Sequence, residues 1–87
     1  MRLVDKTTVW DMGNKRFEGR KKKFNVTICY SMRSLSREKD NPYWYYIVHR
    51  KEDDKRHNSL WTNENFNTKE ECIEAAEKKI EELIKEK

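Results

Sequence analysis

The most constraining feature of the sequence is a run of six apolar and aromatic residues in its second half, Tyr43–Val48. Aromatic and β-branched residues of this kind favour an extended strand. Residues of one parity are Trp44, Tyr46 and Val48, and those of the other are Tyr45 and Ile47. A strand with one solvent-exposed side needs apolar residues on the other side only. We therefore expect either a central strand with an exposed aromatic patch, or an N-terminal segment folded over that patch.

A helix is predicted from Thr68 to the end of the chain. Thr68 and Glu71 have the spacing of a capping box, in which the threonine side chain accepts a hydrogen bond from the first turn. Apolar residues then recur at helical spacing and form one stripe: Cys72, Ile73, Ala76, Ile80, Leu83 and Ile84. The charged segment 51–56 predicts a hairpin turn before the helix, and Leu60-Trp61 predicts a further short strand.

The segment Phe24–Met32 predicts the most regular strand, because apolar and polar residues alternate along it. This pattern places one side against a core and the other toward solvent. Cys29 falls on the polar side, whereas Cys72 belongs to the apolar stripe of the helix. The two thiols are therefore predicted to be reduced and not joined in a disulfide.

These elements predict an α+β fold, an antiparallel sheet of three or four strands with one C-terminal helix packed on one face. With 87 residues, of which 34% are hydrophobic, the chain is expected to form a single small domain spanning residues 1–87 with a thin core. A short strand is expected within residues 2–10. The segment 11–23 holds both glycines and is predicted to be a loop.

Charge is unevenly distributed along the chain. Residues 1–56 hold 15 lysines and arginines against 8 acids, whereas residues 57–87 hold 5 against 8. Six basic residues lie close together in the predicted loop: Lys15, Arg16, Arg20, Lys21, Lys22 and Lys23. They indicate either a phosphate-binding loop or a solvated turn. Arg33 and Arg37 lie in the polar connection before Pro42, which is either an ordinary loop or a second contact loop.

Several classes of function are not favoured. The N-terminus turns polar at once and no apolar run approaches the length of a membrane span, so a cytoplasmic protein with no membrane partner is expected. The acids 52–54 read as a solvated turn, and His49 and His57 without cysteine or carboxylate neighbours make a poor zinc site. Neither a catalytic constellation nor a cofactor motif is recognised, so an enzyme is the least favoured interpretation.

The order of strand, turn, strand and helix resembles that of known DNA-binding domains. The features that carry the resemblance are the strand 44–48, Leu60-Trp61, and the segment 66–72 followed by Ala75-Ala76. They resemble the three-stranded-sheet-plus-helix domains of plant ethylene-response factors and of phage integrase arm-binding domains. The resemblance covers less than half of the chain. The chain lacks the usual glycine before Phe66 and has few arginines on the strands. It implies a sheet lying in the DNA major groove, with His49, Arg50 and one side of the aromatic strand outward.

Two functional hypotheses follow. The first is a small non-catalytic nucleic-acid-binding domain, whose contact residues would be Lys15, Arg16, Arg20, Lys21, Lys22, Lys23, Arg33, Arg37, Trp44, Tyr45 and Arg50. The alternative is a protein-binding inhibitor or regulator of the compact kind that phages encode, an anti-CRISPR for instance, which would use the aromatic strand as its anchor and its charges to reach an acidic surface of a protein target. An open edge strand would also permit a homodimer.

Overall fold

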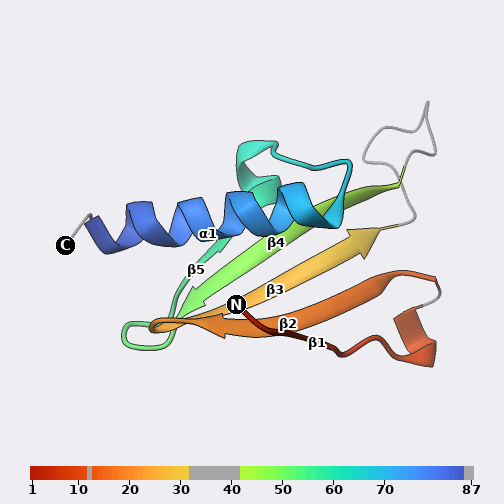
Figure 1. The fold of residues 1–87 in the computed structure, drawn as a ribbon, viewed down its shortest axis with the longest axis horizontal. Helices are drawn as coiled ribbons and strands as arrows, with labels where there is room; N and C mark the ends of the chain where they lie inside the picture. The colour runs from red at the N-terminus through yellow and green to blue at the C-terminus, as the bar shows by residue number, and fades with distance from the viewer. Residues whose placement is uncertain (12, 32–41, 86–87) are drawn as a thin grey trace.

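The computed structural model describes residues 1–11, 13–31 and 42–85, and they form one sheet and one long helix (Figure 1). The sheet is antiparallel and its five strands follow one another in chain order. The strands are β1 (Leu3–Asp5), β2 (Lys15–Lys21), β3 (Phe24–Ser31), β4 (Tyr43–Arg50) and β5 (Lys55–Asn58). Two short 3-10 helices, η1 (Val9–Asp11) and η2 (Ser59–Thr62), precede β2 and follow β5, and α1 (Lys69–Lys85) comes last. The α+β class with a C-terminal helix is confirmed.

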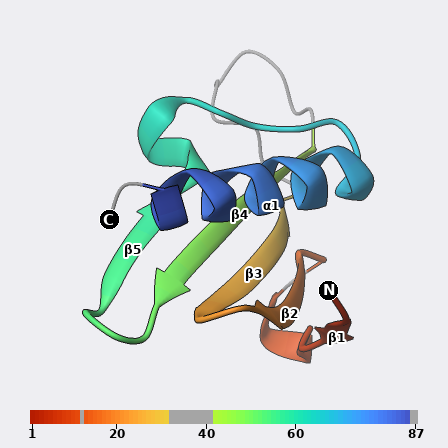
Figure 2. The same ribbon diagram turned by 60° about the vertical axis from the view of Figure 1, so that its left-hand side comes forward.

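The core lies between α1 and the strands β3 and β4, and Figure 2 shows α1 lying across them. β3 contributes Phe24, Val26 and Ile28, and β4 contributes Tyr46 and Val48. The helix contributes Cys72, Ala76 and Ile80, each fully buried. Small Cys72 and Ala76 allow the helix backbone to approach the sheet, so that the aliphatic side chains of β3 can pack directly beneath it.

The predicted cap and stripe of the helix are confirmed. The Thr68 hydroxyl oxygen accepts a hydrogen bond from the backbone N–H of Glu71 at 3.2 Å. Such a cap satisfies one of the N–H groups that have no partner within the helix. Cys72 faces the core, whereas Cys29 belongs to the opposite side of β3, and both are free thiols as predicted.

The sheet has five strands and not the predicted three or four. The additional strand is β2, which lies in the segment 11–23 that the sequence predicts to be a loop. β2 pairs with β3 along its whole length, from Lys15 opposite Tyr30 to Lys21 opposite Phe24. Its sequence is mostly charged, which is typical of loops, but alternate positions Phe17 and Gly19 face the covered side. Gly19 is required there, since an added Cβ would lie 2.7 Å from the Arg2 carbonyl oxygen. The N-terminal segment thus widens the sheet sideways.

The segment after β4 also differs from expectation. The turn is only 51–54, with Asp54 in the left-handed region (φ 57°), and β5 begins at Lys55. Leu60 and Trp61 lie in η2, not in a strand. The cause is Asn58, whose side-chain oxygen accepts a hydrogen bond from the Leu60 N–H at 2.9 Å and so starts a 3-10 turn.

Candidate nucleic-acid interface

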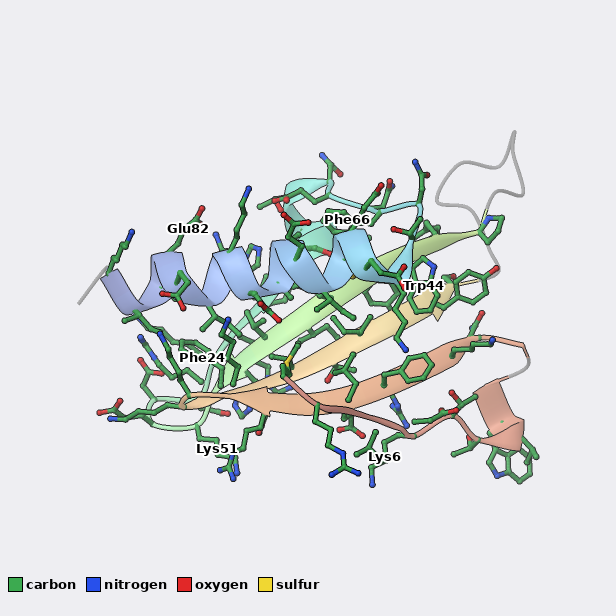
Figure 3. All side chains as sticks on the ribbon, in the orientation of Figure 1. Lys6, Phe24, Trp44, Lys51, Phe66 and Glu82 are labelled. Carbon is green, nitrogen blue, oxygen red and sulfur yellow. The ribbon has the colours of Figure 1, made fainter. Side chains whose placement is uncertain are left out.

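The two sides of the sheet differ, because α1 packs on one of them. We call the other side the open face, and the register assigns its residues. They are Val4 from β1, Arg16, Glu18 and Arg20 from β2, Asn25, Thr27, Cys29 and Ser31 from β3, Tyr43, Tyr45, Ile47 and His49 from β4, and Arg56 and Asn58 from β5. Most of them line an open concavity of about 560 Å³. Lys6 and Lys51 also point away from α1 (Figure 3).

One row of the open face consists of nitrogen-bearing side chains only. Arg20 lies opposite Asn25, Asn25 opposite His49, and His49 opposite Arg56. Four strands at about 4.8 Å spacing make this row roughly 14 Å wide. A second row joins Arg16, Cys29 and Tyr45. The fold therefore gathers cations from strands that are distant in sequence onto one surface.

Charge is divided between the two sides of the molecule. Among the strand residues that the structure describes on the open face, the arginines are Arg16, Arg20 and Arg56 and the carboxylate is Glu18. The helix α1 carries six glutamates and four lysines. The positive side is thus the open sheet and the negative side is the helix, which turns the charge asymmetry of the sequence into two opposite surfaces.

Tyr45 lies half-buried in the middle of the open face. Desolvation, and then its proximity to Cys29 and Tyr43, raise the pKa of Tyr45 to about 12. Its phenol is therefore neutral at physiological pH and can donate a hydrogen bond. The rings of Tyr45 and Tyr43 are 6.0 Å apart between centroids and tilted by 40°. The ring of Tyr45 contributes an apolar surface to the open face.

Four residues of the predicted basic loop do not belong to the open face. Lys21 pairs with Glu77 of α1 at 3.2 Å, and Lys22 pairs with Glu81 at 3.0 Å. The hydrogen bond from Lys22 lowers the pKa of Glu81. Lys23, at the turn, lies 3.9 Å from Glu52. The structure therefore separates the predicted cluster. Arg16 and Arg20 lie on the open face, whereas Lys15 lies opposite Tyr30 and belongs by register to the covered side, although it also lines the concavity.

Arg50 and Trp44 also lie on the covered side. Arg50 donates two hydrogen bonds to the Asp53 carboxylate, at 2.9 and 2.5 Å, and its guanidinium lies 6.0 Å from the centre of the Phe24 ring. Trp44 packs against Tyr30 (4.8 Å between ring centroids) and Phe17 (6.2 Å). In Figure 3, Trp44 lies near the start of α1. Arg33 and Arg37 lie outside the described residues.

The two histidines point to opposite sides of the sheet, since His49 pairs with Arg56 and His57 pairs with Val48. His49 contacts Asp54 of the turn. Across the described residues, no three histidine, cysteine or acidic side chains come together as metal ligands would. Within the same residues, no helix is long and apolar enough to cross a membrane.

Sequence reasoning missed Arg56 and Asn25 as members of this surface. The sequence predicts a turn over residues 51–56, and a turn does not define the face on which Arg56 lies. Extending the strand from His57 back to Arg56 would have predicted that these two side chains lie on opposite faces. Asn25 was visible as a polar position of β3, but only the register aligns it with Arg20 and His49.

Comparison with known proteins gives no further guide: no protein-family model, no curated protein and no solved structure matches the chain. The resemblance to ethylene-response-factor and integrase arm-binding domains therefore stays a prediction.

Proposed function

We propose that this protein binds nucleic acid through the open face of its sheet. The observation that carries the proposal is the register that aligns Arg20, Asn25, His49 and Arg56 in one row on the side away from α1. Arginine guanidinium groups bind phosphate oxygens and base edges in bidentate fashion. Asparagine reads base edges as well, so this row combines backbone contact with the capacity for direct recognition.

The remaining parts of the open face suit the same ligand. Arg16, also on β2, is the third arginine of the open face and lies two positions from Glu18. Tyr45 lies in the same row as Arg16, beyond Cys29, and aromatic rings on sheets stack with unpaired bases. The acidic helix lies on the far side, where it would repel a polyanion and thereby favour one orientation of binding.

Lys21 and Lys22 take a different part in this proposal. Their ion pairs with Glu77 and Glu81 connect the end of β2 to α1. They stabilise the position of β2, whose arginines make the contact, and are themselves secondary to binding.

The test is a salt titration of affinity for short double-stranded and single-stranded DNA and RNA. If three arginines contact phosphates, log Kd should rise with log salt with a slope of about 2 to 3. The triple variant R16Q/R20Q/R56Q should lose most of this slope. The triple variant K69Q/K78Q/K85Q removes the same charge from α1, on the other side of the sheet, and serves as the control. The proposal would be overturned if both triple variants lost the salt slope equally, or if the protein bound none of these nucleic acids at low salt.

A second candidate is a protein-binding inhibitor or regulator, which the exposed tryptophans favour. Trp10 of η1 is 86% exposed and Trp61 of η2 is 68% exposed. Tryptophan is frequent among the residues that dominate protein interfaces. Under this function, Trp10→Ala or Trp61→Ala would abolish capture of a protein partner, and R16Q/R20Q/R56Q would change mainly the association rate.

A further inference from the structure

A second, smaller hollow lies at the edge of the sheet, on the side that α1 covers. It occupies about 230 Å³ between β5 and the C-terminal half of α1, beside the core residues Phe24 and Leu83. β5 forms this edge of the sheet in Figure 2. The other lining residues all carry nitrogen: Arg50, Lys55, Arg56, His57 and Lys79. None of the lining residues is a carboxylate, so the edge hollow is a concentrated positive site.

His57 is the unusual member of the edge hollow. Its Nε2 is buried and finds no hydrogen-bond partner within the described part of the chain. Its ring lies 6.1 Å from that of Tyr46 and 6.2 Å from that of Trp61, between centroids. Desolvation, with the nearby charge of Lys79, lowers the pKa of His57, whereas Glu64 and Glu82 act in the opposite direction. A buried ring nitrogen without a partner is costly, so His57 is an energetically unfavourable member of this wall. The ring lies among the cations of the hollow, and a bound anion would change its electrostatic environment.

The cations around His57 differ in how firmly they are held. Arg50 is bound to Asp53 by two hydrogen bonds and so contributes a partly neutralised charge. Lys79 lies 3.5 Å from Glu82 in an i,i+3 pair whose glutamate is 65% exposed. Such surface pairs are weak, so Lys79 can turn toward a stronger anion. Lys55 and Arg56 are exposed on the edge strand.

The size of the edge hollow restricts what it can hold. Its volume lies below the range of about 300–1,000 Å³ that is usual for drug-sized ligands. A tetrahedral oxyanion fits such a space, and lysine and histidine donors are its usual partners.

We propose that the edge hollow binds a phosphate group through the cations Lys79, Lys55 and Arg56, with the His57 ring in its wall. Arg56 lines both the edge hollow and the concavity of the open face. The phosphate can therefore come from a nucleic-acid backbone that crosses the edge at β5, or from a small phosphorylated molecule. The site itself does not depend on the function proposed for the open face.

The experiment follows the histidine ring resonances by NMR during a titration with inorganic phosphate at constant ionic strength. The expected result is a saturable shift of His57 and a rise of its pKa in the presence of phosphate. His49, the other of the two histidines, lies on the opposite side and provides an internal control. Lys79→Gln should weaken phosphate binding about tenfold. Lys6→Gln, which removes the same charge near β1, should leave phosphate binding unchanged.

A His57 response no larger than that produced by chloride, or equal in Lys79→Gln and the wild type, would overturn the site. Short duplex DNA then identifies the source of the phosphate. If Lys79→Gln also lowers the salt slope of DNA binding by about 1, the phosphate belongs to the backbone. If DNA binding is unchanged by Lys79→Gln or absent altogether while phosphate still binds, the ligand is a small phosphorylated molecule. Absence of DNA binding would count against the open face alone.

Discussion

The covered side and the open face of the sheet are built from alternate residues of the same strands, yet they serve different ends. On the covered side, Val26, Ile28 and Tyr46 are almost completely buried under α1. On the open face, their immediate neighbours Asn25, Thr27 and Tyr45 carry polar groups. In a small chain, residues of one parity can form the stabilising core while residues of the other parity remain available for binding. Substitutions on the two sides should therefore affect stability and binding separately.

The largest expected effect compares two isoleucines. Ile28 is fully buried on the covered side, whereas Ile47 lies half-buried on the open face. Ile28→Ala should lower the free energy of unfolding by about 2–5 kcal/mol, because it removes core contacts and leaves a cavity. Ile47→Ala should cost about 1 kcal/mol, mainly through lower strand propensity. Urea unfolding followed by circular dichroism measures both.

Equal losses for the two alanine variants would mean that the open face is also a packed surface. If Ile28→Ala leaves too little folded protein, Ile28→Val provides the comparison, with an expected cost of about 0.5–1.5 kcal/mol.

The next comparison is between two aromatic neighbours in β4 and concerns binding. If Tyr45 stacks on a base, Tyr45→Ala should weaken binding to single-stranded nucleic acid by about 1–3 kcal/mol. Trp44→Phe, on the covered side, should leave the affinity unchanged. Fluorescence anisotropy at fixed salt measures the affinities. If Trp44→Phe lowered the affinity and Tyr45→Ala did not, binding would lie on the covered side of the sheet, which would contradict the proposal.

A smaller effect is expected at the ion pair that joins the two layers. A double-mutant cycle of Lys21→Met and Glu77→Gln should give a coupling energy of about 0.2–1 kcal/mol, since both side chains are partly exposed. Arg20 is adjacent to Lys21 but faces the other side, so the cycle of Arg20→Met with Glu77→Gln should give none. Chemical denaturation provides the four free energies in each cycle. Coupling in the Arg20 cycle would contradict the assignment of the two faces.

The smallest effect concerns the turn between β4 and β5 at low pH. The hydrogen bond from Arg50 lowers the pKa of Asp53 to about 2, from an ordinary value of 3.8. Because the folded state holds the carboxylate ionised, its contribution to stability is present above pH 4 and is lost as the pH falls toward 2. Asp53→Asn should therefore be slightly less stable than the wild type above pH 4 and equal to it near pH 2. Thermal unfolding across this range tests the difference.

Asp54→Asn is the comparison variant in the same turn: it leaves the Arg50 pair intact and removes instead the contact between Asp54 and His49. A pH dependence that Asp54→Asn changes and Asp53→Asn does not would show that the carboxylate responsible is Asp54.

The sequence by itself determined the elements with a clear period or cap. Alternation along Phe24–Ser31 was enough to predict β3, and Thr68 with the apolar stripe was enough to predict α1, because both signals are local. The separation of Cys29 from Cys72 followed from the same alternation.

Only the tertiary structure decided where the charges point. Lys21 and Arg20 are adjacent and both basic, but Lys21 reaches Glu77, which lies 56 positions further along the chain, while Arg20 aligns with Asn25 on the open face. The sequence of β4 is apolar on both parities, so it could not show which side α1 covers. The physical reason is register: a shift of one residue exchanges the two faces of a strand, and register is fixed by pairing and packing between segments that are distant in the sequence.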